Sequence, residues 1–133
     1  MKLRRFALAI VLIVVFAGCA AAPPQGSQTP QHEAITPGQA MEMMSADAVI
    51  LDVRTPEEFM AEHIENAILL PVEELAERAA EFLPNPEQVI LIYCRSGRRS
   101  EDAWHILAEL GYQNIYDFGG IIQWSQTFHT VRP

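Results

Sequence analysis

The sequence predicts an α/β domain with a central, mainly parallel sheet and helices on both faces. Two short segments, AVILDV (48–53) and QVILIYC (88–94), are continuously apolar. Uninterrupted runs of this length are typical of strands that are buried on both faces. Segments long enough to form helices separate these two strands from each other and from two weaker strand candidates. Such alternation of strands and helices favours parallel pairing of the strands. At 133 residues the chain has room for one domain.

Two N-terminal caps define the first half of the domain. Thr36 followed by Pro37 predicts a short helix that ends near residue 45. The apolar run 48–53 is then the first strand. Thr55-Pro56-Glu57-Glu58 is a capping-box pattern that opens a second helix, with Phe59 on its buried side.

The second half repeats the alternation of strand and helix. Residues 67–71 are a second short strand, 72–83 an amphipathic helix, and Pro-Asn-Pro after it a break. The strand 88–94 leads to a helix over 100–110 that Gly111 ends. The last expected elements are a strand and turn over 114–120 and a short helix near 121–124.

The N-terminus has the layout of a secretory signal peptide, which we assign to residues 1–18. Lys2, Arg4 and Arg5 precede an uncharged apolar run over 6–17. That run is about a dozen residues long, shorter than the roughly 20 that cross a membrane as a helix. Cleavage is therefore favoured over a retained anchor helix.

The end of this segment, Phe16-Ala17-Gly18-Cys19, resembles the bacterial lipoprotein signal, although Phe16 stands where leucine is usual. The resemblance implies that Cys19 becomes a lipid-modified N-terminus in the cell envelope, on the periplasmic face. The alternative is an ordinary signal peptide that leaves a free thiol. Residues 19–34, rich in Pro, Gly, Gln and Ser, are then a flexible tether, and 35–133 the domain.

Removal of the signal peptide makes the chain strongly acidic. Six arginines and no lysine remain beside all seventeen acidic residues, so the formal net charge becomes −11. Nucleic acid and anionic lipid headgroups are poor partners for such a chain. Arg95, Arg98 and Arg99 are half of the remaining cations, so any bound anion is expected to be small and local.

Cys94 lies at the end of a predicted strand, and the loop CRSGRR leads from it into a helix. Ligands bind at the carboxyl ends of the strands in such sheets. The helix N-terminus, nearby arginines and the backbone amides freed by Gly97 all favour a thiolate. The alternatives are an inert buried cysteine, or a disulfide with Cys19. Candidate substrate-binding residues are Arg95, Ser96, Gly97, Arg98, Arg99 and Ser100.

The chain resembles the single-domain rhodaneses in three motifs. These are ILDVRTPEEFMAEHIENAILLP (50–71), ILIYCRSGRRS (90–100) and FGGIIQW (118–124). The resemblance implies the rhodanese fold and a sulfurtransferase in which Cys94 accepts sulfane sulfur from a donor such as thiosulfate. The resulting persulfide then transfers its sulfur to cyanide, a thiol or a protein. Related phosphatases and arsenate reductases have one more residue in the loop than this chain.

Asp52 and Arg54 match the Asp-x-Arg of the family, and we assign them structural roles as a buried carboxylate and its ion-pair partner. His63 is expected to be a turn or core histidine. The other histidines are scattered and offer no metal-ligand spacing, so neither metal nor cofactor is expected. We expect a monomeric sulfurtransferase that handles a small anionic donor. A non-catalytic persulfide carrier or partner-binding module is the alternative, followed by a phosphatase or arsenate reductase.

Overall fold

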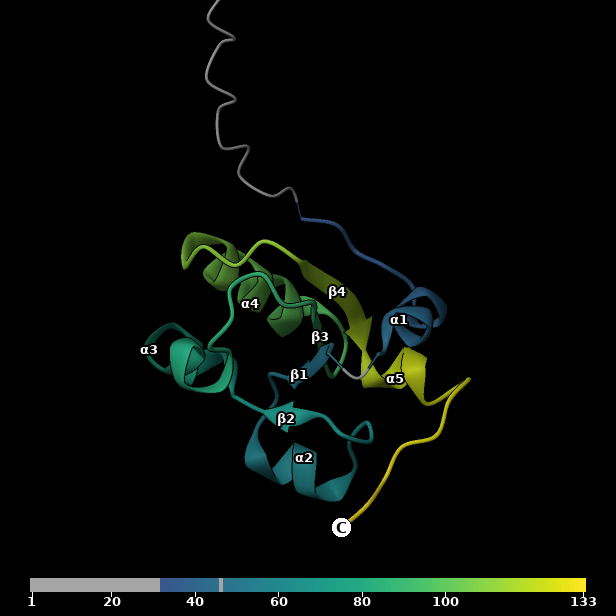
Figure 1. Ribbon diagram of the computed structural model, residues 1–133. Helices are drawn as coiled ribbons and strands as arrows, with labels where there is room; N and C mark the ends of the chain where they lie inside the picture. The colour runs from purple at the N-terminus through teal and green to yellow at the C-terminus, as the bar shows by residue number, and fades with distance from the viewer. Residues whose placement is uncertain (1–31, 46) are drawn as a thin grey trace, which may run out of the picture.

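The computed structural model describes residues 32–45 and 47–133, and it confirms the predicted α/β class (Figure 1). Four parallel strands form one sheet in the order β2-β1-β3-β4. Each of the four predicted strands is present, although β2 is shorter than expected. Their bounds are Val49–Asp52 for β1, Ile68–Leu69 for β2, Ile90–Cys94 for β3 and Ile115–Gly120 for β4.

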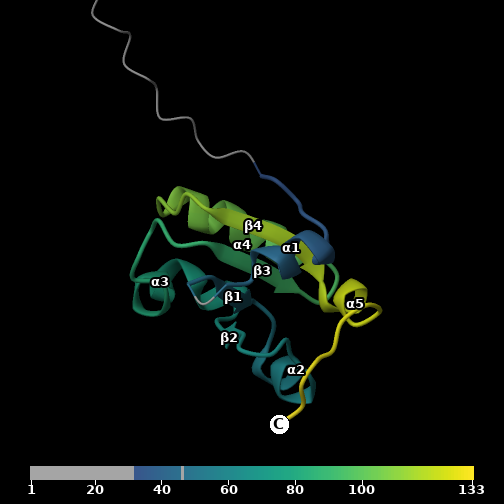
Figure 2. The ribbon, with the colours of Figure 1, turned by 45° about the vertical axis from the view of Figure 1, so that its right-hand side comes forward.

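Five helices surround the sheet within the described residues. The longer pair, α3 (Val72–Phe82) and α4 (Arg98–Glu109), covers one face. The shorter pair, α1 (Pro37–Met43) and α5 (Ile121–Trp124), covers the other. Figures 1 and 2 show this layering, with α2 (Pro56–Ala61) beneath β2.

The helix boundaries follow from their caps. Thr36 and Thr55 each complete a capping box, and each is followed by a proline at the first helical position. The start of α4 differs from the prediction: the helix begins at Arg98 and not at Ser100. Gly97 caps α4 with a φ of 114°, and this places Arg98 and Arg99 in the first helical turn.

Alternate residues of the strands enter two separate cores. Leu51, Val53 and Ile92 pack against α3 and α4, together with Cys94. Ile50, Leu91 and Tyr93 belong to the core beneath α1 and α5. The apolar runs are continuous because helices cover both faces of the sheet.

The N-terminal predictions fall mostly outside the described residues. These are the signal peptide, Cys19 and the tether as far as residue 31. Ala34, which the sequence places in the tether, instead forms a parallel bridge with Asp117 at the edge of β4. No helix of the described part is long and apolar enough to span a bilayer.

Candidate active site

Cys94 is the last residue of β3, at the carboxyl edge of the sheet. The residue is 1% exposed, and its Sγ accepts a hydrogen bond from the backbone N–H of Gly97 at 3.0 Å. Only glycine adopts the φ of Gly97, 114°, without steric cost. The loop thus turns back on the sulfur and presents an amide to it at the N-terminus of α4.

The loop backbone is fixed against the end of β4. The buried hydroxyl of Ser100 donates to the carbonyls of Gly97 (2.8 Å) and Gly119 (3.3 Å). A Cβ at Gly120 would lie 2.3 Å from the carbonyl oxygen of Arg95, so only glycine fits there. Ser100 therefore supports the loop through its side chain, whereas the side chain of Ser96 is exposed.

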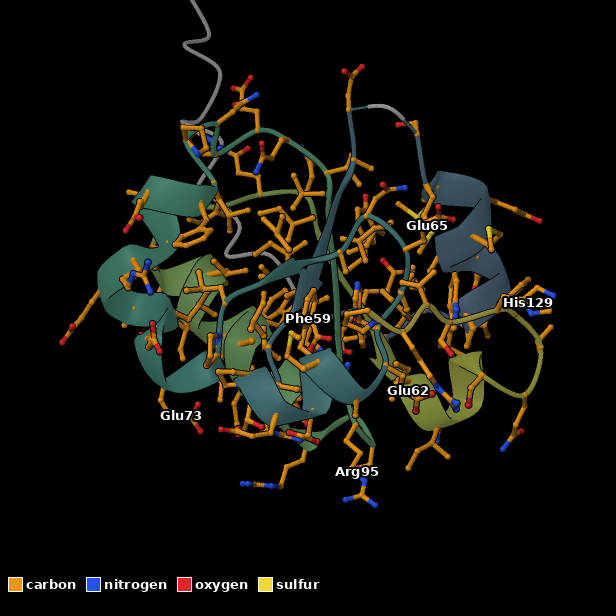
Figure 3. All side chains as sticks on the ribbon, turned by 90° about the horizontal axis from the view of Figure 1, so that it is seen from below. Phe59, Glu62, Glu65, Glu73, Arg95 and His129 are labelled. Atoms are coloured by element: carbon orange, nitrogen blue, oxygen red, sulfur yellow. The ribbon has the colours of Figure 1, made fainter. Side chains whose placement is uncertain are left out.

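The three arginines after Cys94 have different environments. Arg99 forms two hydrogen bonds with the carboxylate of Glu58, at 2.7 and 2.8 Å. The side chain of Arg98 is 82% exposed, with Asp102 3.7 Å away. Arg95 is exposed and has no ion pair among the described residues. Figure 3 shows its side chain extending from the ribbon into solvent.

Glu58 connects the second predicted helix to the loop of residues 94–99, here called the Cys94 loop. Its carboxylate caps α2 by accepting from the Thr55 N–H at 3.1 Å and also binds Arg99. The hydrogen bonds from Arg99 lower the pKa of Glu58 to about 2, and those to Glu58 raise the pKa of Arg99. The sequence indicated only the capping role, because 41 residues separate Glu58 from Arg99.

The Asp52–Arg54 ion pair is present and almost fully buried. Arg54 donates from Nε (2.9 Å to Oδ1) and Nη2 (2.6 Å to Oδ2), and its Nη2 also donates to the carbonyl of Glu62 at 2.7 Å. The guanidinium lies 5.4 Å from the ring centroid of Tyr93, on the neighbouring strand. Burial, followed by the charge of Asp52, raises the pKa of Tyr93. This pair joins β1 to the segment after α2.

A pocket of about 250 Å³ lies beside the Cys94 loop. Arg95 supplies one side, α2 and its C-terminal end supply a second, and Ile121 and Ile122 of α5 supply a third. Figure 3 shows Glu62, another lining residue, next to α5. No local sequence pattern indicates this pocket, because its walls come from three segments that are distant along the chain.

The histidines are less scattered than the sequence indicated. The ring of His32 lies 5.9 Å from that of His105, and its Nε2 is 3.1 Å from Oδ2 of Asp117. The other carboxylate oxygen of Asp117 accepts the N–H of Gly119 at 2.9 Å. His63 stacks on Phe59, and its Nδ1 lies 2.9 Å from the Phe59 carbonyl oxygen, as expected of a turn histidine.

Fold and site together define an α/β domain that presents a strand-end cysteine to the N-terminus of a helix. The profile of the rhodanese-like domain family matches residues 36–127. The chain belongs to this rhodanese-like family.

Relatives place the chain among sulfurtransferases. It is 39% identical to Thiosulfate sulfurtransferase PspE of Escherichia coli over 53% of this chain and 68% of that one. It is 30% identical to Thiosulfate sulfurtransferase GlpE of Pseudomonas entomophila over 74% and 89%, respectively. A solved structure described as a rhodanese with anions from E. coli is 34% identical, with a TM-score of 0.60 over 65% of this chain and 99% of that chain.

Proposed function

We propose that the protein is a sulfurtransferase that carries sulfane sulfur as a persulfide on Cys94. The observation that carries this proposal is the hydrogen bond from the Gly97 amide to the Cys94 sulfur. An amide aimed at a sulfur atom beside a helix N-terminus stabilises negative charge there. The sulfur therefore has a fixed electrostatic environment both as a thiolate and as a persulfide anion.

The reaction divides into two nucleophilic displacements. In the first, the Cys94 thiolate attacks the outer sulfur of thiosulfate; a new S–S bond forms, the S–S bond of the donor breaks, and sulfite leaves. In the second, an acceptor such as cyanide or a thiolate attacks the terminal sulfur of the persulfide. The bond to Cys94 then breaks and regenerates the thiolate. No proton donor is needed, because both leaving groups are stable anions.

Arg95 is the donor-binding cation in this proposal. Arg99 is occupied by Glu58, and Arg98 lies on the solvent side of α4. Arg95 lies next to the nucleophile and lines the pocket beside it. Because the chain is acidic as a whole, local binding by this residue outweighs long-range attraction of the anion.

A thiosulfate:cyanide assay on the wild type and on Cys94→Ala tests the proposal. We expect thiocyanate formation by the wild type, none by the variant, and a mass gain of one sulfur atom on Cys94 after thiosulfate alone. Circular dichroism of the variant controls for folding. Turnover by Cys94→Ala would refute the assignment of the nucleophile. Sulfur loading without turnover would favour a non-catalytic persulfide carrier. Hydrolysis of a phosphate ester or reduction of arsenate, without sulfur loading, would favour a phosphatase or an arsenate reductase.

We also propose that the protein is exported and anchored by lipid on Cys19. The lipoprotein-like sequence before Cys19 supports this location. Membrane fractionation and mass analysis of the wild type and Cys19→Ser test it. The wild type should fractionate with membranes and carry acyl chains, whereas the variant should be released. A membrane-bound Cys19→Ser would contradict the lipid anchor.

A further inference from the structure

The pocket beside the Cys94 loop has the position expected of a second substrate site. Arg95 directly follows Cys94 and forms part of the pocket wall. The carbonyl of Arg95 also packs against the start of α5, where the Ile122 N–H lies 3.4 Å from it. A small molecule in the pocket therefore lies beside the backbone that positions the sulfur.

Arg54 brings guanidinium donors to the wall of the pocket. Its side chain is only 3% exposed, and Nε and Nη2 bind Asp52 and the Glu62 carbonyl. Nη1 forms no hydrogen bond to any residue in 32–45 or 47–133, and Arg54 lines the pocket. A guanidinium nitrogen at a pocket wall can donate to an acceptor oxygen, most of all an anionic one.

Most charges around the pocket are paired within the described residues. Asp52 compensates Arg54, and Arg99 compensates Glu58, so neither pair contributes a net charge. Arg95 adds one free cation. Glu62 adds one carboxylate, which accepts from Thr130 Oγ1 at 3.3 Å. This balance accommodates one carboxylate near Arg54 and Arg95.

The rest of the wall is apolar. Ala61, Ile121 and Ile122 line the pocket, and Ile122 remains 44% exposed at its rim. Thiosulfate, sulfite and cyanide have no carbon chain to place against these side chains. A ligand with a short methylene stem gains from burying it there, at about 0.8 kcal/mol for each methylene.

We propose that this pocket is the acceptor subsite and that it binds a small thiol with one carboxylate on a short aliphatic stem. This inference rests on the proposed persulfide chemistry of Cys94. The thiolate of the ligand attacks the terminal sulfur, a bond forms between the two, and the S–S bond to Cys94 breaks. Cys94 leaves as a thiolate and the ligand leaves as its persulfide, so no oxidant or reductant is consumed.

The test uses full-length protein loaded with sulfur from thiosulfate or, if that fails, from polysulfide. Loss of the persulfide is followed by mass after addition of 3-mercaptopropionate or 2-mercaptoethanol, with rates expressed per thiolate. We expect 3-mercaptopropionate to react about fivefold faster at low concentration, equivalent to about 1 kcal/mol. The acidic chain by itself repels the anionic thiol and predicts the reverse. Equal rates, or a slower carboxylate thiol, would overturn the inference.

Two substitutions to glutamate test whether the preference for the carboxylate thiol arises in the pocket. Ile122→Glu adds a negative charge at the rim and should reduce the ratio of the two rates to about one or below. Met60→Glu, at a 60% exposed position that does not line the pocket, is the matched control and should keep the ratio. The ratio of the rates with the two thiols is measured for each variant separately. A change in the loop that slows both thiols equally therefore leaves this ratio unchanged. An unchanged ratio in Ile122→Glu would overturn the subsite.

The possible outcomes distinguish a failure of this inference from a failure of the proposed sulfurtransferase function. A protein that gains no sulfur from either donor refutes the proposed function and the subsite together. A protein that loads sulfur and transfers it without preferring the carboxylate thiol keeps the function and loses only the subsite.

Discussion

The adjacent strands β1 and β3 both end in polar residues at the same edge of the sheet, but they use them in opposite ways. At the end of β1, Asp52 and Arg54 bind each other, 0% and 3% exposed. At the end of β3, Cys94 receives only a backbone amide, and Arg95 has no acidic partner in the described structure. The charge at the end of β1 is therefore paired and buried, whereas the cation at the end of β3 is exposed and unpaired within the described residues.

Breaking the buried pair at β1 should have the largest effect. Asp52→Ala leaves the Arg54 guanidinium buried without its counter-charge, which costs about 3–5 kcal/mol in the free energy of unfolding. Urea denaturation measures this loss. Asp47→Ala, at an exposed position, is the control and should stay within about 0.5 kcal/mol of the wild type. A loss below about 1 kcal/mol for Asp52→Ala would show that the buried Asp52–Arg54 pair does not stabilise the fold.

The next effect concerns the support of the β3 end. Gly120→Ala places a Cβ 2.3 Å from the Arg95 carbonyl oxygen, so the loop or β4 must move. We expect a cost of about 1–3 kcal/mol and a clear loss of sulfur transfer. Gly38→Ala in α1 meets nothing nearer than 3.9 Å and should leave both thermal stability and transfer at or above wild-type levels. Full transfer by Gly120→Ala would show that the close contact does not position the loop.

Arg95→Gln tests whether the unpaired cation at β3 is available to the donor. We expect the KM for thiosulfate to rise roughly tenfold, equivalent to about 1.4 kcal/mol, with little change in stability. Arg98→Gln removes a cation from a side chain that is 82% exposed and should change KM much less. Steady-state kinetics at fixed ionic strength measures both variants. Equal effects would mean that the donor responds to total charge and not to Arg95.

The smallest effect is a pH dependence that belongs to the Glu58–Arg99 pair. Because folding lowers the pKa of Glu58 from 4.5 to about 2, the pair stabilises the fold fully above pH 4.5. This stabilisation is lost as the pH falls from 4.5 through 2. Solvent screening limits it to about 1 kcal/mol, since Arg99 and Glu58 are 21% and 26% exposed.

Glu58→Gln should flatten the decrease in stability across this acidic window. Glu57→Gln, one residue earlier and exposed, should leave the decrease as in the wild type. Denaturation midpoints at several pH values between 2 and 5 make the comparison. A decrease that is identical in Glu58→Gln and the wild type would show that the pair does not stabilise the fold.

Local patterns were enough to predict most of the fold. The apolar runs of β1 and β3 and the caps at Thr36 and Thr55 depend only on neighbouring residues, and all four features are present. Ser100 was predicted as the start of α4. Its hydroxyl instead binds the carbonyl of Gly97, and the helix begins earlier, behind that glycine.

Only those parts of the site that are formed by residues close together in the sequence were predictable. Cys94 at the end of a strand followed by a glycine-containing loop is a short sequence pattern. The occupation of Arg99 by Glu58, the approach of Arg95 to Gly120 and the pairing of His32 with Asp117 all join distant parts of the chain. Each depends on which residues the tertiary fold brings together, and a single sequence holds no signal for that.

The parallel bridge between Ala34 and Asp117 fixes the direction in which the first described residues run. Because the bridge is parallel, residues 32–34 run alongside β4 toward the carboxyl edge of the sheet. Cys94 lies at the same edge, at the end of β3. The described chain therefore approaches, in its first residues, the edge that holds the buried sulfur.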